Sequence, residues 1–185
     1  MAFKFKKTGI DDVILVSSDR YSDERGFFEE DYKLSDFSYG EIRERFAQIN
    51  HSFSRRGVLR GLHYQKAPHS QGKLVFVVRG KIMDVAVDIR QSSSSFKRWV
   101  SVILSDGEGH LLWIPTGFAH GFLALEDSDV IYLTTSEYGK EYESGVRWND
   151  PDINIKWPTD SPILSEKDGN LPFIKEMIER GELQP

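Results

Sequence analysis

Residues 109–120, GHLLWIPTGFAH, and residues 57–80, which begin GVLRGLHYQ, are the two stretches that decide the fold. The first opens with a glycine, followed after five residues by a P-x-G-x-x-H frame that ends at His120. The second also opens with a glycine, followed after five residues by His63. Each combines glycine turns with short apolar runs, the pattern of β-strands. The sequence therefore predicts two histidines on strands of one β-structure.

Together the two stretches resemble the paired motifs of the cupin superfamily, whose first motif normally supplies two histidines and a glutamate to a metal. Here Gln65 occupies the second histidine position and Lys73 the glutamate position. An ammonium group disfavours a bound cation, so the sequence predicts no metal. What remains is His63, Lys73 and His120. This set suits proton abstraction beside a carbonyl, with the lysine facing the developing oxyanion.

Composition restricts the class of protein. With 185 residues, 39% hydrophobic and 12% aromatic, the chain is predicted to be one globular domain spanning residues 1–185. A net charge of -5 gives no sign of a nucleic-acid partner. The lack of cysteine excludes disulfides and thiolate chemistry, and no apolar run approaches the length of a membrane helix. We expect a soluble, cytoplasmic protein without a membrane partner.

The periodicity is mostly that of strands. Within residues 83–89, Val85 and its alternate neighbours form one face, and Asp84, Ala86 and Asp88 form the other. Further strands are predicted at residues 10–16, 73–78, 81–89, 99–104, 110–114, 122–126 and 130–135. Two helices are predicted, at residues 35–46 and 172–180. Many short strands at regular spacing favour an all-β sandwich or barrel.

Several further segments resemble one cupin family, the dTDP-4-dehydrorhamnose 3,5-epimerases. The matching segments keep their order from about residue 10 to residue 172. They are RGFFEE (25–30), QINHS (48–52), RGLHYQ (60–65), QGK (71–73), DVAVDIR (84–90), WIPTGFAHGF (113–122), WNDP (148–151) and LSEKD (164–168). Any one segment is weak evidence, whereas the ordered set is specific.

The resemblance implies a cupin jelly roll, or double-stranded β-helix, with a few short helices. It implies a homodimer that uses no cofactor and whose partner is a dTDP-sugar substrate, dTDP-4-dehydro-6-deoxy-D-glucose. The family inverts C3 and C5, the carbons that flank the C4 ketone. Because that ketone acidifies both C–H bonds, a base, an oxyanion stabiliser and an opposed acid suffice. The lack of a nicotinamide or flavin motif in the sequence agrees with this chemistry.

Four residues are the catalytic candidates. His63 is the predicted general base, and the resemblance implies that Asp168 orients it. Lys73 is predicted to stabilise the enolate oxygen, and the resemblance implies that Tyr132 reprotonates the opposite face. Each has an ordinary alternative: His63 as a structural histidine, Asp168 in a solvated turn, Lys73 as a strand-end lysine, and Tyr132 as a core aromatic.

Substrate-binding candidates form a second, polar set. Arg25, Arg60 and Lys167 could hold the diphosphate, although surface salt bridges are the common use of such residues. His120 could bind the sugar or its oxyanion, or could merely pack where the family's ancestors held a metal. The resemblance adds further polar and aromatic residues, with core packing as the alternative for the two phenylalanines: Glu30, Gln48, Asn50, Glu143, Phe27, Phe122 and Tyr138.

Three other functions compete with the full epimerase. A relative on the same scaffold could epimerise only one carbon or isomerise the ketone. A metal-dependent cupin dioxygenase is disfavoured, because His63 and His120 alone do not complete a facial triad. A sugar-binding module without catalysis would need the polar set but no base and acid across the sugar.

Overall fold

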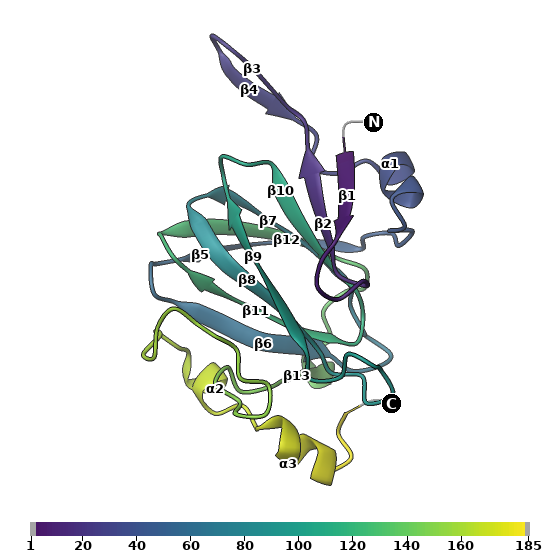
Figure 1. Cartoon of the computed structure of the whole chain (residues 1–185), viewed down its shortest axis with the longest axis vertical. Helices are drawn as coiled ribbons and strands as arrows, with labels where there is room; N and C mark the ends of the chain where they lie inside the picture. Colours follow the sequence, from purple (N-terminus) through teal and green to yellow (C-terminus); the bar gives the residue numbers. More distant parts are fainter. Residues whose placement is uncertain (1–2, 184–185) are drawn as a thin grey trace.

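The computed structural model describes residues 3–183, whose strands form two antiparallel sheets and a separate hairpin (Figure 1). The six-stranded sheet has the order β1 (Phe3–Lys7), β2 (Ile14–Ser18), β10 (His110–Ile114), β7 (Lys73–Arg79), β12 (Ser128–Thr134) and β5 (Gln48–Ser54). The five-stranded sheet has the order β13 (Glu143–Gly145), β6 (Leu59–Gln65), β11 (Phe118–Ala124), β8 (Lys81–Asp88) and β9 (Trp99–Ser105). The predicted all-β jelly roll is confirmed.

The two sheets face each other across a shared apolar core. Val75 and Val77 of β7 pack in one cluster with Ile82 and Ala86 of β8, so residues from both sheets meet. Because side chains alternate along a strand, every second residue of β7 and β8 enters this layer. The alternation predicted for residues 83–89 is therefore correct, and both of its faces are buried.

Short helices cover the outer faces of the sheets. On the five-stranded sheet, Ile174 and Met177 of α3 (Ile174–Glu179) pack with Val85 and Val87. On the six-stranded sheet, Phe37 of α1 (Leu34–Tyr39) packs with Phe3 and Leu74. α2 (Glu166–Gly169) lies beside β6 in Figure 1, and a 3-10 turn η1 (Lys140–Tyr142) precedes β13.

The hairpin of β3 (Arg20–Asp23) and β4 (Gly26–Glu29) projects from the end of β2, away from both sheets (Figure 1). Its aromatic residues Tyr21, Phe27 and Phe28 are 59–65% exposed in the single chain. Large apolar side chains gathered on a projecting ribbon are a feature of interaction surfaces.

Several predicted boundaries are wrong. The helix predicted for residues 35–46 ends at Tyr39, because Gly40 packs against the Phe5 ring and Glu41 adopts a positive φ of 71°. The strand predicted for residues 10–16 begins only at Ile14. The C-terminal helix covers Ile174–Glu179, within the predicted residues 172–180. Within residues 3–183, no helix combines the length and apolar content needed to cross a membrane.

Candidate active site

A β-bulge in β6 directs two site residues to the same side of the sheet. His63 is paired with His120 of β11, and Arg60 is paired with Phe122, so three steps along β6 match two along β11. Without that extra residue, positions 60 and 63 would face opposite sides. Gly61 lies at the bulge with a φ of +126°, and a Cβ there would lie 2.6 Å from the Gly121 Cα. Glycine is therefore needed at this position.

The opposite wall comes from the six-stranded sheet. Gln48, Asn50 and Ser52 alternate along β5 with residues that are exposed. Thr134 of β12 is paired with Gln48 on one side and with Lys73 on the other, and Tyr132 is paired with Asn50. Strand alternation then places Lys73, Tyr132 and the β5 polar residues on the inner face.

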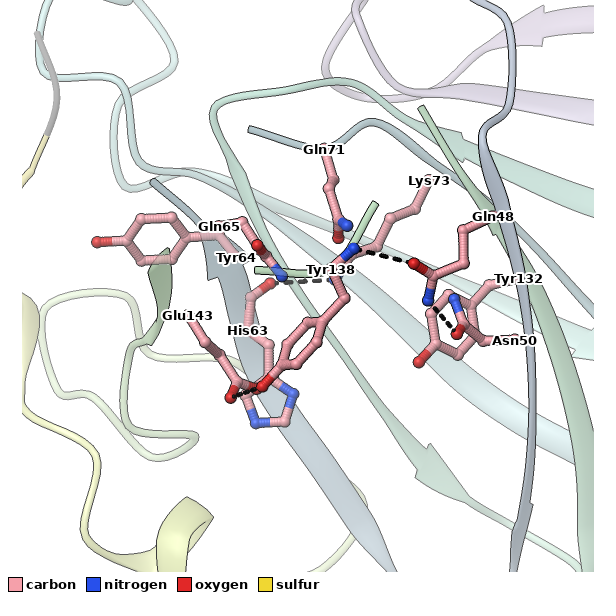
Figure 2. A pocket seen from close by; sticks show the side chains of 10 residues that line it. All are labelled: Gln48, Asn50, His63, Tyr64, Gln65, Gln71, Lys73, Tyr132, Tyr138 and Glu143. Atoms are coloured by element: carbon pink, nitrogen blue, oxygen red, sulfur yellow. Dashed lines mark hydrogen bonds between the residues drawn. The ribbon is translucent and has the colours of Figure 1, made fainter. Parts of the chain in front are cut away.

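These inner faces enclose two adjoining cavities of about 310 and 320 Å³. Both are lined by His63, Lys73, Tyr132 and Glu143. The first, shown in Figure 2, also has Gln48, Asn50, Tyr64, Gln65, Gln71 and Tyr138 in its wall. The second also has Ser52, Arg60, His120, Phe122, Ser165, Lys167 and Asp168. The shared residues make the pair one two-lobed site.

His63 and Asp168 form a hydrogen-bonded pair. The His63 Nε2 atom lies 2.6 Å from the Asp168 Oδ1 atom. Asp168 is buried on α2, where Ser165 caps the helix by accepting a hydrogen bond from the Asp168 backbone N–H at 3.1 Å. Burial raises the pKa of Asp168, but the hydrogen bond and charge of His63 outweigh it and hold the pKa below its ordinary value. The carboxylate therefore stays ionised and can stabilise an imidazolium.

Lys73 is the buried cation of the site. Burial lowers the pKa of its ammonium from 10.5 to about 8, although the charges of Asp84 and Glu143 act to raise it. The Nζ atom donates to the His63 backbone carbonyl at 3.3 Å. Lys73 is thus protonated at neutral pH and is poorly solvated. An ammonium in such a setting is suited to stabilising an oxyanion.

His120 is buried and lines the second lobe. Its Nε2 atom is 2.7 Å from the Asp84 Oδ1 atom. Burial lowers the pKa of His120, and the carboxylate of Asp84 only partly offsets this. The imidazole is therefore neutral near pH 7. Tyr132 is likewise neutral, since burial raises the pKa of its phenol above the ordinary value of 10.0.

A polar cluster lies across the outer part of the site. Figure 2 shows the Tyr138 hydroxyl donating to Glu143 Oε2, a distance of 2.7 Å. Lys167 forms an ion pair with the same carboxylate. Nearby, the Arg60 guanidinium donates to Ser54 Oγ at 2.8 Å and to the Phe53 carbonyl at 2.9 Å.

The structure brings together most of the predicted site residues. Those that line the cavities are His63, Lys73, Tyr132, Asp168, Gln48, Asn50, Arg60, His120, Phe122, Tyr138, Glu143 and Lys167. Arg25, Phe27 and Glu30 do not, because they lie on or just after the projecting hairpin. Arg25 pairs there with Asp23, and Phe27 packs under the Arg20 guanidinium.

Other lining residues were not predicted. Ser52, Tyr64, Gln65, Gln71 and Ser165 contribute to the walls. Ser52 could have been predicted from the sequence, because it lies two residues after Asn50 and so continues the alternate positions of Gln48 and Asn50. Gln65 and Gln71 lie in quoted motifs but carried no assigned role.

This site offers an oriented imidazole, a buried ammonium and a neutral phenol. Its side chains are not arranged as a set of metal ligands. Within the described part of the chain, no three His, Cys, Asp or Glu side chains converge as metal ligands, and a lysine occupies the place of one ligand. The arrangement can remove a carbon-bound proton, stabilise an enolate and return a proton.

Comparison with known proteins gives the same family over nearly the whole chain. The family model described as dTDP-4-dehydrorhamnose 3,5-epimerase matches residues 7–176. A relative of that name from Methanothermobacter thermautotrophicus is 48% identical over 178 residues, covering 94% of this chain and 96% of the relative.

Solved structures agree. The dTDP-6-deoxy-D-glucose-3,5-epimerase of Legionella pneumophila, solved with dTDP-4-keto-L-rhamnose, has a TM-score of 0.92 and 41% identity, covering 98% of this chain and 97% of that one. ChmJ, a 3'-monoepimerase from Streptomyces bikiniensis solved with dTDP-quinovose, has a TM-score of 0.90 and 33% identity, covering 96% and 91%. One scaffold thus accommodates both full and single-centre epimerases.

Proposed function

The chain belongs to the dTDP-4-dehydrorhamnose 3,5-epimerase family, and from that premise we propose that it inverts C3 and C5 of dTDP-4-dehydro-6-deoxy-D-glucose. The product is dTDP-4-dehydro-L-rhamnose. Identity to the full epimerases, at 41% and 48%, exceeds the 33% identity to the 3'-monoepimerase, which favours inversion at both carbons.

One observation carries the proposal: the base and the acid candidates lie on facing sheets. His63 belongs to β6 of the five-stranded sheet, and Tyr132 to β12 of the six-stranded sheet. Both line the same cavity, so a sugar ring held between the sheets has the imidazole on one face and the phenol on the other. Inversion of a carbon needs this opposition.

The proposed reaction repeats one step at two carbons. His63 takes the proton from C3 or C5, and the C–H electrons form the C=C bond of an enolate whose charge rests on the C4 oxygen. Lys73 stabilises that oxygen, while Asp168 stabilises the imidazolium. Tyr132 then donates its phenolic proton to the opposite face of the carbon. Solvent returns a proton to Tyr132 and removes one from His63.

Proton NMR of dTDP-4-dehydro-6-deoxyglucose incubated with the protein in deuterium oxide tests this function. Inversion with deuterium at both C3 and C5 is the expected result. Deuterium and inversion at one carbon alone would make the protein a single-centre epimerase. Binding of the nucleotide sugar without exchange at either carbon would contradict an epimerase.

Tyr132→Phe should separate proton abstraction from inversion. Without the phenol, His63 can still remove a proton and return solvent deuterium to the same face. We expect inverted product to fall by about 100-fold while exchange with retention of configuration continues. The same NMR experiment measures both. Loss of exchange and inversion to equal extents would contradict the role of Tyr132 as the opposed acid.

The nucleotide is assigned to the outer part of the same site. Tyr138 is half-exposed and can stack on the thymine, while Lys167 and Arg60 can hold the diphosphate. Lys167 is paired with Glu143, so an incoming phosphate would exchange with that carboxylate. Polar side chains of Gln48 and Asn50 would complete recognition.

The hairpin residues are assigned to a second subunit's site. Arg25, Phe27 and Glu30 line neither lobe in their own chain, whereas the exposed aromatics of the β3–β4 hairpin suit a protein contact. We propose a homodimer in which this hairpin brings Arg25 to the diphosphate bound by the partner.

Subunit mixing tests this dimer. Arg25→Ala should weaken dTDP binding about 10-fold through loss of a charged contact. Inactive His63→Asn chains and Arg25→Ala chains are mixed in equal amounts, denatured and refolded together. About half of the dimers are then hybrids, and each hybrid has one site with both His63 and Arg25 intact. Fully active sites should therefore recover to about a quarter of the total. Absence of recovery in a mixture shown to be dimeric would contradict Arg25 acting across the interface.

A further inference from the structure

Asp84 is a buried carboxylate that the proposed reaction does not use. It lies on β8 with an exposed fraction of 0%, paired in register with Phe122 of β11. Its Oδ1 atom lies 2.7 Å from His120 Nε2. Its Oδ2 atom is buried and has no hydrogen-bond partner among residues 3–183. A carboxylate oxygen in this state is costly unless a positive charge lies nearby.

Lys73 is the positive charge that fits. It is buried on β7 of the facing sheet and lines the same lobe as His120. The Lys73 ammonium donates to the His63 backbone carbonyl at the long distance of 3.3 Å. The negative charge of Asp84 favours the ammonium form of Lys73 and raises its pKa, even without direct contact.

We propose that Asp84 is a positioning residue that orients the His120 ring and keeps Lys73 in its ammonium form for the reaction. This inference rests on the proposed epimerase function and extends it. Asp84 would not contact the sugar. It would act through His120 and Lys73, which contact the sugar.

The orientation of His120 follows from the hydrogen bond. A carboxylate only accepts, so His120 Nε2 must donate to Asp84, and the neutral ring then presents Nδ1 as an acceptor. Such a ring can accept from a sugar hydroxyl but cannot donate to the C4 oxygen. The enolate would then depend on Lys73.

The pH dependence follows from the groups that face Lys73. They are Asp84 on β8, Glu143 on β13, His63 on β6, His120 on β11 and Tyr132 on β12. The pKa of Lys73 is about 8, whereas burial holds the pKa of Tyr132 above 10.0. The loss of kcat/KM at high pH should therefore report Lys73 deprotonation. Removing the Asp84 charge lowers the pKa of Lys73 further.

Asp84→Asn in the full-length protein tests this inference. We expect the alkaline limb of kcat/KM to move down by about one pH unit, which is about a fivefold loss of activity at pH 8 and about a 10-fold loss at pH 9. Affinity for dTDP should change less than about twofold, since Asp84 forms no hydrogen bond or ion pair with the proposed nucleotide contacts Arg60, Tyr138 and Lys167. Asp84→Glu keeps the charge and should keep the alkaline limb near its original position.

Asp88→Asn is the matched control. Asp88 is a second fully buried carboxylate on the same face of β8, but it is paired with Arg90, Ser93 and Ser95. Its loss should destabilise the fold without moving the alkaline limb. An Asp84→Asn profile with an unmoved alkaline limb would overturn the inference.

A direct titration covers the case in which Asp84→Asn does not fold. The protein is labelled at lysine Cε, the Lys73 signal is assigned with Lys73→Met, and its titration is followed by NMR without substrate. A titration near pH 8 is expected, and a Lys73 already neutral at pH 7 would overturn the inference. Failure of the epimerase itself would appear instead as absent deuterium exchange in the unmodified protein.

Discussion

His63→Asn should lower turnover by on the order of 10⁴-fold, because it removes the imidazole that lines both lobes of the described site and is hydrogen-bonded to Asp168. Asparagine keeps a polar side chain of similar length but cannot accept a proton from carbon. We expect dTDP affinity within about twofold of the unmodified protein, since the nucleotide contacts lie at Tyr138, Lys167 and Arg60. Deuterium exchange at C3 and C5 measures the lost step directly.

Two comparisons make this result specific. Asp168→Asn leaves the imidazole in place but removes its carboxylate partner, so it should retain more activity than His63→Asn, with a loss of about 100-fold or more. His51→Asn is the matched control. His51 lies on the exposed face of β5, paired with Asp129, and its loss should leave turnover unchanged. Exchange at a normal rate in His63→Asn would refute the base assignment.

Lys73→Met should lower kcat by on the order of 10³-fold with little change in dTDP affinity. Methionine has a similar shape but cannot stabilise charge on the C4 oxygen. The rate of deuterium exchange should fall together with inversion, because both require the enolate. Lys81→Met is the control, since Lys81 is a half-exposed lysine at the β7–β8 turn, paired with Glu126.

The low pKa of Lys73 also predicts a stability difference. The folded-state pKa of about 8 lies below the ordinary value of 10.5, so between these pH values the unfolded chain binds more protons at this residue. This contribution to the free energy of unfolding is present above pH 10.5 and is lost as pH falls through 8. Denaturant titrations should show the unmodified protein gaining stability over Lys73→Met across that window. A constant difference would contradict a buried, titrating lysine.

Much of the fold was predictable because most of its strands have a recognisable local sequence pattern. Lys73–Arg79 and Lys81–Asp88 are runs of branched and apolar residues separated by a glycine with positive φ, and they form the expected hairpin. By contrast, Gln48–Ser54 is polar at alternate positions on its inner face, since those positions line a cavity. A strand was not predicted here, although residues 48–52 were among the segments that resemble the family.

The site was predictable in composition but not in geometry. His63 and Asp168 are 105 residues apart, and nothing local to residues 164–168 indicates that a short helix buries the carboxylate against β6. Asp84 was placed in an alternating strand and in the matching segment DVAVDIR (84–90), but it was given no role. Its importance depends on a neighbour 36 residues away and on an oxygen without a partner, which only the folded chain reveals.

The extra residue in β6 means that the strand changes parity halfway along. On the N-terminal side of Gly61, the even-numbered residue Arg60 points into the site. On the C-terminal side, the odd-numbered residues His63 and Gln65 point into it. A gap or insertion misplaced by one residue here would exchange the reacting side chains with Leu62 and Tyr64 of the outer apolar layer. Sequence alignments and designed variants of this scaffold must therefore keep the count between Arg60 and His63 fixed, even where residue identities are free to vary.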